Sequence, residues 1–156
     1  MANRMLRLGV AAGLAGGAAE IAWVAIYGAI TGTPVGAVAR GVTTALLPGL
    51  TNVPFIGAIG IVLHMLLAVM LGVAVVAAFS APLLRRVGAW PQSMLVVLAL
   101  GAVWSFNFMV VLPRLDPGFL VLLPMVVTLA SKLLFGVSAA AVLRMQRFTS
   151  YAVSAT

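Results

Sequence analysis

Four long apolar segments, separated by shorter stretches rich in polar residues, glycine and proline, make up most of the chain. About 20 apolar residues in a helix suffice to cross the hydrocarbon layer of a membrane. The pattern therefore predicts an all-α fold: a polytopic membrane protein, built as a four-transmembrane-helix bundle and forming a single domain over residues 1–156. The four expected spans cover residues 8–30, 55–79, 94–112 and 119–143.

A short additional helix is expected in the first break, residues 31–54. Thr33 and Pro34 have the identities of an N-cap and a first helical residue, and Pro48-Gly49 would end the helix. Apolar residues between these signals fall on one side, which is typical of a helix that lies at the membrane interface. The polar side of this helix is expected to carry Arg40 and Thr43 or Thr44.

The remaining breaks are predicted to be a loop, a tight turn and a tail. Residues 80–93 form the loop between the second and third spans and contain Arg85-Arg86. Pro113-Arg-Leu-Asp-Pro-Gly118 has the composition of a tight turn, so the third and fourth spans should be adjacent and antiparallel. Residues 148–156 are expected to form a short, loose tail.

The distribution of arginine predicts the orientation in the membrane. The segments on one side carry six arginines, whereas the other side carries two, Arg40 and Arg114. Because basic residues are enriched in cytoplasmic loops, both termini and loop 80–93 should face the cytoplasm, with loops 31–54 and 113–118 outside. The six arginines on the expected cytoplasmic side are Arg4, Arg7, Arg85, Arg86, Arg144 and Arg147.

The composition supports the membrane class and excludes several others. Hydrophobic residues make up 64% and charged residues 7% of the chain, whereas about a quarter of a soluble domain is charged. The formal charge of +7 comes from nine basic residues that are thinly spread, so no nucleic-acid partner is expected. The chain has no cysteine, which excludes disulfides, thiolate metal sites and cysteine nucleophiles.

Small residues recur at intervals of four in the expected spans. The first span has three glycines in this register, and the second has two on a face that also carries His64 and Ala68. Such faces let two helices approach closely. The residues expected to pack between helices are Gly9, Gly13, Gly17, Gly60, Gly72, Gly101 and Gly136.

Each expected span also carries one strongly polar side chain near its middle: Glu20, His64, Asn107 and Lys132, in chain order. At a rise of roughly 1.5 Å per residue these four fall into one layer of the bundle. A charge in hydrocarbon costs about 3 kcal/mol on insertion scales, so the carboxylate and the ammonium group should face inward and pair. We expect His64 and Asn107 to complete the hydrogen bonds of this pair.

Three interpretations of this polar belt stay open. It is a structural pair that fixes the packing of the helices, or it passes protons or holds a small ligand. A haem or pigment on His64, with Met65, Met70 or Met109 as second ligand, has little support from a single histidine. No cofactor is therefore predicted. A typical zinc site and the familiar catalytic motifs are absent from the sequence, so we do not expect an enzyme.

Four short elements carry a family resemblance: Gly13-Leu-Ala-Gly16, Leu63-His64-Met65 with the small residues that follow it to Phe79, Arg85-Arg86, and Asn107 before Pro113. In these elements the chain resembles the small bacterial inner-membrane proteins of the YagU-like type. The resemblance implies a bacterial inner-membrane location and an association with acid tolerance. It covers roughly residues 57–113 and the first glycines, and it has no counterpart for the charged pair.

Two functions from different classes follow from these observations. The first is a non-catalytic accessory subunit, or an assembly or stabilising factor, of a larger membrane complex, because helix faces are the main surface that such a short chain offers for recognition. The second is a small proton-linked transporter or channel that uses the midplane Glu/His/Lys belt. In either case the expected partners are membrane lipids and other transmembrane helices, in a larger complex or a homo-oligomer.

Overall fold

The computed structural model describes residues 2–79 and 88–153, and this part of the chain is helical apart from short turns. Two basic loop residues, Arg85 and Arg86, lie outside the described residues. The elements are α1 (Ala2–Thr31), α2 (Val35–Leu46), η1 (Pro48–Leu50), α3 (Ile56–Phe79), α5 (Ala89–Phe106), η2 (Asn107–Val111), α6 (Leu112–Leu115), η3 (Pro117–Val121) and α7 (Met125–Val153).

Four helical stretches are long and apolar enough to cross a membrane: α1, α3, the continuous run of α5 through η2 to α6, and α7. Their apolar windows cover residues 3–31, 56–79, 90–115 and 125–145. The predicted all-α architecture with four candidate spans is therefore confirmed at the level of helix length and composition.

Several predicted boundaries were wrong, and the largest errors lie around the third and fourth spans. The helix expected to end at residue 112 continues to Leu115, and the next long helix begins at Met125 instead of residue 119. The reversal is thus a longer segment that includes the short helix η3, whose N-cap Asp116 accepts a hydrogen bond from the Phe119 amide. The described part of the expected loose tail, up to Val153, is helical and belongs to α7.

The third span continues past its expected end because its hydrogen-bond register changes. Residues 107–111 form a π-helical turn, in which the Leu112 amide donates to the carbonyl of Asn107. A proline has no amide to donate and clashes with the preceding turn of an α-helix. The wider turn, which is itself a rare element, lies directly before Pro113, so the chain passes this proline within a helix.

Helix α2 forms where the sequence predicts it, but its contacts differ from the prediction. The N-cap is Pro34, not Thr33, and no side chain caps the helix. Thr43, expected on the polar side, is fully buried and donates a hydrogen bond of 2.7 Å to the Ile56 carbonyl. This burial is possible because Gly60 of α3 has no side chain, so that the Ala39 backbone can lie against it.

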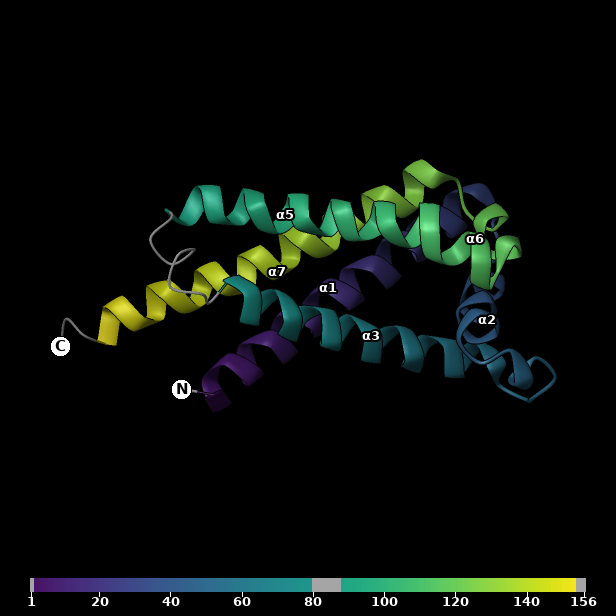
Figure 1. Cartoon of the computed structure of the whole chain (residues 1–156), viewed down its shortest axis with the longest axis horizontal. Coiled ribbons are helices and arrows are strands. Elements are labelled where there is room, and N and C mark those ends of the chain that lie inside the picture. The colour runs from purple at the N-terminus through teal and green to yellow at the C-terminus, as the bar shows by residue number, and fades with distance from the viewer. Residues whose placement is uncertain (1, 80–87, 154–156) are drawn as a thin grey trace.

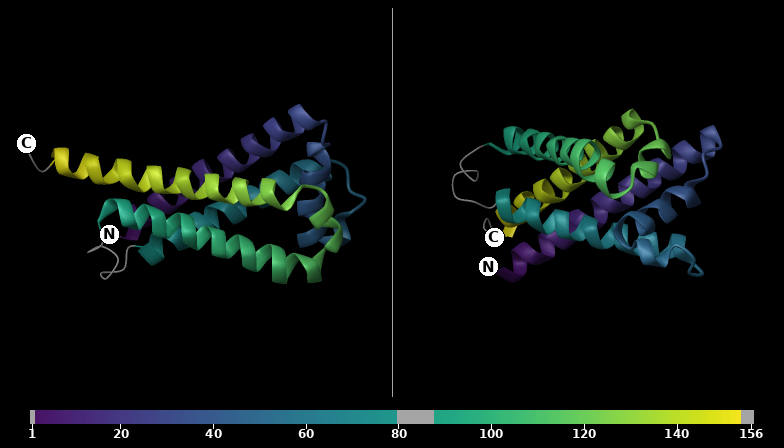
Figure 2. Two further views of the ribbon diagram at one scale, coloured as in Figure 1. Left: turned by 90° about the horizontal axis from the view of Figure 1, so that it is seen from above. Right: turned by 45° about the vertical axis from the view of Figure 1, so that its right-hand side comes forward.

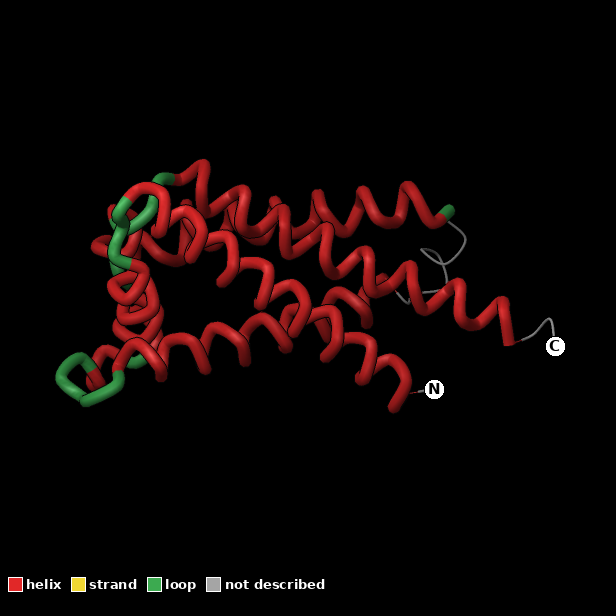
Figure 3. Tube along the Cα trace, turned by 180° about the vertical axis from the view of Figure 1, so that it is seen from behind, coloured by secondary structure: helices red, strands yellow, loops and turns green. Residues whose placement is uncertain are grey.

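The long helices lie side by side, with α1 packed on both α3 and α7, and α7 packed on α5 (Figures 1 and 2). The third and fourth spans are adjacent and antiparallel, as predicted. Both termini lie at one end of the bundle. At the other end α2 runs across the long helices, and the described loops gather there, apart from Gly88 (Figure 3).

Six of the seven glycines expected to pack between helices do so. Gly9, Gly13 and Gly17 of α1 face α3, where a Cβ atom on Gly13 would lie 2.5 Å from the Ala68 carbonyl oxygen. Gly72 faces α1 in return, Gly136 faces Val97 of α5, and Gly60 meets α2 instead of another span. The prediction was wrong for Gly101, which has no heavy atom within 4 Å of the position of a Cβ.

The half of the bundle near the termini is tightly packed. Its buried cluster is built from small and medium side chains around one aromatic ring, Phe135, which is fully buried. Gln92 of α5 donates a 3.1 Å hydrogen bond to the Phe79 carbonyl, which joins the ends of α5 and α3. The other members of the cluster are Ala12, Ala68, Val75, Val76, Val96, Leu100 and Ala139.

We expect Gly72→Ala to destabilise the protein and Gly101→Ala to leave it unchanged or stabilise it. A methyl group on Gly72 meets the Gly13 backbone, which cannot yield as a flexible side chain can, and overpacking costs about 1–3 kcal/mol. At Gly101 the methyl group meets nothing, and alanine is favoured over glycine in a helix by about 1 kcal/mol. The midpoint of thermal unfolding in detergent should fall for Gly72→Ala and stay unchanged or rise for Gly101→Ala; equal shifts would contradict this account of the packing.

Candidate functional site

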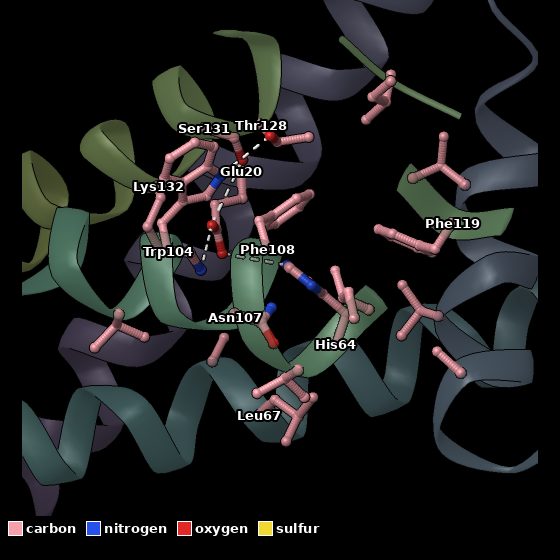
Figure 4. Close-up of a pocket in the computed structure, with 18 of the residues that line it drawn as sticks. Glu20, His64, Leu67, Trp104, Asn107, Phe108, Phe119, Thr128, Ser131 and Lys132 are labelled. Carbon is pink, nitrogen blue, oxygen red and sulfur yellow. Dashed lines mark hydrogen bonds and ion pairs between the residues drawn. The ribbon is translucent and has the colours of Figure 1, made fainter. Parts of the chain in front are cut away.

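Three ionisable side chains from three helices meet in the interior of the bundle. Glu20 lies on α1, His64 on α3 and Lys132 on α7 (Figure 4). The Lys132 ammonium nitrogen is 2.6 Å from Oε1 of Glu20, so the predicted ion pair is confirmed. Nε2 of His64 is 3.5 Å from the other carboxylate oxygen, Oε2. We call these three residues the polar cluster.

The glycine pattern of α1 positions the lysine. Phe135 packs flat against Gly16, where a Cβ atom would lie 2.6 Å from the ring. The Lys132 ammonium group in turn lies 5.1 Å from the centroid of this ring, within the range of a cation–π contact. The lysine is thus held between an aromatic face and a carboxylate that is only 4% exposed.

The hydrogen bonds of the pair are completed differently from the prediction. Ser131, one residue before the lysine, places its hydroxyl 3.5 Å from Oε1 of Glu20. Asn107, where the π-helical turn begins, makes no hydrogen bond with the pair and lies on the wall of the cavity described below. Sequence spacing gave its depth in the bundle but could not give the local change of helical register.

Two polar atoms of the cluster are left without a partner. Glu20 Oε2 and His64 Nε2 are both buried and make no hydrogen bond with the described residues. They lie 3.5 Å from each other, which is within the range of an ion pair but long for a hydrogen bond. Buried polar atoms nearly always have a hydrogen-bond partner, and a proton shared between these two atoms would satisfy both.

The polar cluster forms one end of a cavity of about 330 Å³. Its walls come from all the long helices, and α2 and the reversal after α5, which lie at the end of the bundle away from the termini, also contribute to the lining. Apolar side chains dominate this lining, which is typical of small-molecule sites. Besides the cluster, the polar side chains on the wall are those of Asn107, Thr128 and Ser131, together with the Trp104 indole.

Two indole groups fix the start of α7 against the cavity, a role that the sequence analysis missed. Trp104 donates a 3.0 Å hydrogen bond to the Thr128 hydroxyl, which itself donates to the Met125 carbonyl. Trp23 of α1 donates a 3.0 Å hydrogen bond to the Val127 carbonyl. The sequence offered one signal for such a hydrogen bond, namely a tryptophan near the middle of an apolar segment and within reach of a threonine on the next apolar segment.

The structure adds no second ligand for the haem alternative at His64. Met70 and Met109 are 67% and 63% exposed, and the sulfur of Met65 lies near Gly17 of α1. None of the three methionines lines the cavity. Within residues 2–79 and 88–153 no group of three or more acidic, histidine or cysteine side chains is placed to hold a metal ion.

The fold and the site together define a class, a small helical protein with four potential membrane spans and an interior polar cluster that faces a cavity. Comparison with protein-family models, curated proteins and solved structures finds no match. The resemblance to YagU-like proteins therefore stays a prediction.

We expect Glu20→Gln and Lys132→Met to destabilise the protein singly and much less in combination. Removing one partner of a buried ion pair leaves an uncompensated charge and costs about 3–5 kcal/mol. Replacing both groups removes this charge together with its cost. Thermal unfolding in detergent of the two single variants and the double variant gives the coupling energy; additive losses would contradict direct pairing.

Proposed function

We propose that the protein is a multi-pass protein of the bacterial cytoplasmic membrane and acts there as a small proton-linked transporter. The excess of arginine at the end that carries both termini supports a cytoplasmic location for that end. In this orientation the cavity and α2 lie toward the outside. A substrate in the cavity is coupled to a proton at the polar cluster.

One observation carries this proposal: the buried ionisable groups form the end wall of a cavity, and the bundle is packed tightly on the other side of them. The cavity extends from the cluster toward α2, whereas the side toward the termini is filled around Phe135. The tight packing closes the site toward the termini, and alternating access requires each state of a transporter to be closed toward one side of the membrane. Intramembrane acids and histidines are typical of proton pathways.

The geometry of the cluster supports a division of roles. Lys132 contacts Oε1 of Glu20 and thereby holds the carboxylate in place. Oε2 and His64 Nε2 have no other partner among the described residues and lie 3.5 Å apart, so a proton can reside on either atom or be shared between them. The charged groups that face His64 are Glu20 and Lys132, and the wall from α5 contributes only uncharged side chains.

Proton flux into liposomes tests this proposal. Wild-type protein should acidify the vesicle lumen under an imposed pH gradient, and His64→Leu should lower the rate at least tenfold because it removes one of the two proton-carrying atoms. Ser105→Ala is the matched control, since the Ser105 hydroxyl bonds only to the Gly101 carbonyl of its own helix and does not line the cavity. Flux equal to that of empty vesicles, with folded protein present, would refute the proposal.

The accessory-subunit function is a second candidate, supported by a different observation. Among the seven glycines expected to pack between helices, Gly101 alone has no heavy atom within 4 Å of the position of a Cβ. It lies on α5 near the exposed side chains of Leu98 and Met94. A face of this kind fits a helix of another membrane protein. The other glycines of the set are already used within the bundle, so this face is where such a partner would bind.

A leucine at position 101 tests the second candidate. Gly101→Leu should leave the folded monomer intact, because no heavy atom lies within 4 Å of the position of a Cβ at this residue. The variant should, however, lose co-migration with any larger complex in mild detergent. Native mass measurement of the wild type and the variant gives the answer. A wild-type mass equal to that of the single chain would exclude this candidate.

A further inference from the structure

We propose that the cavity binds a neutral molecule with an apolar body and one hydroxyl group, such as a phenol or an alcohol, taken up from the lipid phase. This inference names the substrate class for the site of the proposed transporter and rests on that function only for the transport step. The binding itself follows from three features of the cavity: its charge balance, its unpaired atoms and its rim.

The charge balance of the polar cluster favours a neutral ligand. Glu20 and Lys132 form a close pair and compensate each other, and they are the charged side chains on the wall of the cavity when His64 is neutral. A cationic or anionic head group placed beside them would leave one buried charge without a counterpart. Because an uncompensated charge is costly in a low-dielectric interior, a ligand that carries no net charge is favoured.

The two unpaired atoms of the cluster match the two hydrogen-bonding functions of a hydroxyl group. Glu20 Oε2, on a carboxylate that is 96% buried, accepts hydrogen bonds, and His64 Nε2 donates one in the tautomer that carries its proton there. A hydroxyl group donates to the first and accepts from the second. Both residues line the cavity, and less than 1 Å² of either atom is accessible, so a ligand hydroxyl group reaches the two atoms when the His64 ring moves away from the carboxylate (Figure 4).

The walls and rim of the cavity match an apolar body. Close to the cluster the wall is formed by aromatic rings, with Trp104 and Phe108 stacked at 5.4 Å and Phe119 next to them. The lining residues that are substantially exposed are all leucine or valine, which makes the entrance apolar. These rim residues are Leu46, Leu67, Val103 and Leu115.

The position of the rim indicates entry from the side of the bundle. Leu67 of α3 is 47% exposed and Val103 of α5 is 42% exposed. These two helices are joined near the termini by the Gln92 hydrogen bond, whereas their main packing partners are α1 and α7, respectively. The part of the cavity between them therefore faces the region that acyl chains would occupy if the four helices span a membrane.

Four probes with the same aromatic body separate the possible head groups. They are 4-(trifluoromethyl)phenol, (trifluoromethyl)benzene, 4-(trifluoromethyl)benzylammonium and 4-(trifluoromethyl)benzoate. Fluorine NMR on the full chain in lipid nanodiscs detects a saturable bound signal for each, with the dissociation constant expressed as a mole fraction in lipid. We expect the phenol to bind about tenfold more tightly than the other three, since it alone offers a hydroxyl group to the two atoms without a net charge.

Matched variants locate this binding. His64→Leu should bring the ratio of the dissociation constants of (trifluoromethyl)benzene and the phenol to about one. Binding of (trifluoromethyl)benzene should persist, and a general loss of structure would not leave it intact. Val103→Phe should weaken both probes at least fivefold by narrowing the rim. Val62→Phe is the matched control, because Val62 of α3 is 59% exposed and does not line the cavity, so this change should affect the binding of neither probe.

The outcomes distinguish this inference from the proposed function. Equal binding of phenol and (trifluoromethyl)benzene, tighter binding of a charged probe, or no saturable signal would each overturn the inference. Proton flux that depends on His64 without selectivity for the phenol would leave the transporter proposal standing and refute the substrate class. Selective phenol binding without proton flux would leave the substrate class standing and refute the transporter proposal, and it would define a binding protein.

Discussion

The carboxylate of Glu20 and the ammonium group of Lys132, 2.6 Å apart in an apolar interior, constrain the rest of this structure. Two opposite charges in such surroundings must stay together, because separating them exposes each to a medium that cannot solvate it. The pair therefore fixes how α1 and α7 lie against each other. It also determines where the bundle is polar, and hence which end of the cavity can bind a polar group.

Close packing on one side of this pair and a cavity on the other give the molecule its asymmetry. Toward the termini the glycines of α1 bring α3 so close that backbone meets backbone, and Phe135 fills the space over Gly16. Toward the other end α2 enters between the helices and buries Thr43 against the start of α3. Toward this end a cavity remains between the long helices, and residues of α2 and of the reversal after α5 form part of its wall.

Much of this architecture could be predicted from the sequence, and the failures have a common cause. Hydropathy located four helices that are long and apolar enough to cross a membrane, and of the seven glycines expected to pack between helices six do so, whereas Gly101 does not. A spacing rule cannot tell which face of a helix finds a partner, since that depends on helices far away in the chain. The same limit applies to Asn107, whose depth in the bundle was predictable but whose neighbours were not.

The sequence by itself determined the class of fold, the layer that holds the polar side chains and the pairing of the acid with the lysine. These follow from local composition and from the cost of a charge in an apolar medium, and neither requires knowledge of the neighbouring helices. Only the tertiary structure decided that Ser131, and not Asn107, completes the pair, and that Glu20 and His64, which both line a cavity, each have one buried atom without a hydrogen bond. Those outcomes depend on crossing angles and side-chain directions, which arise when the helices pack together.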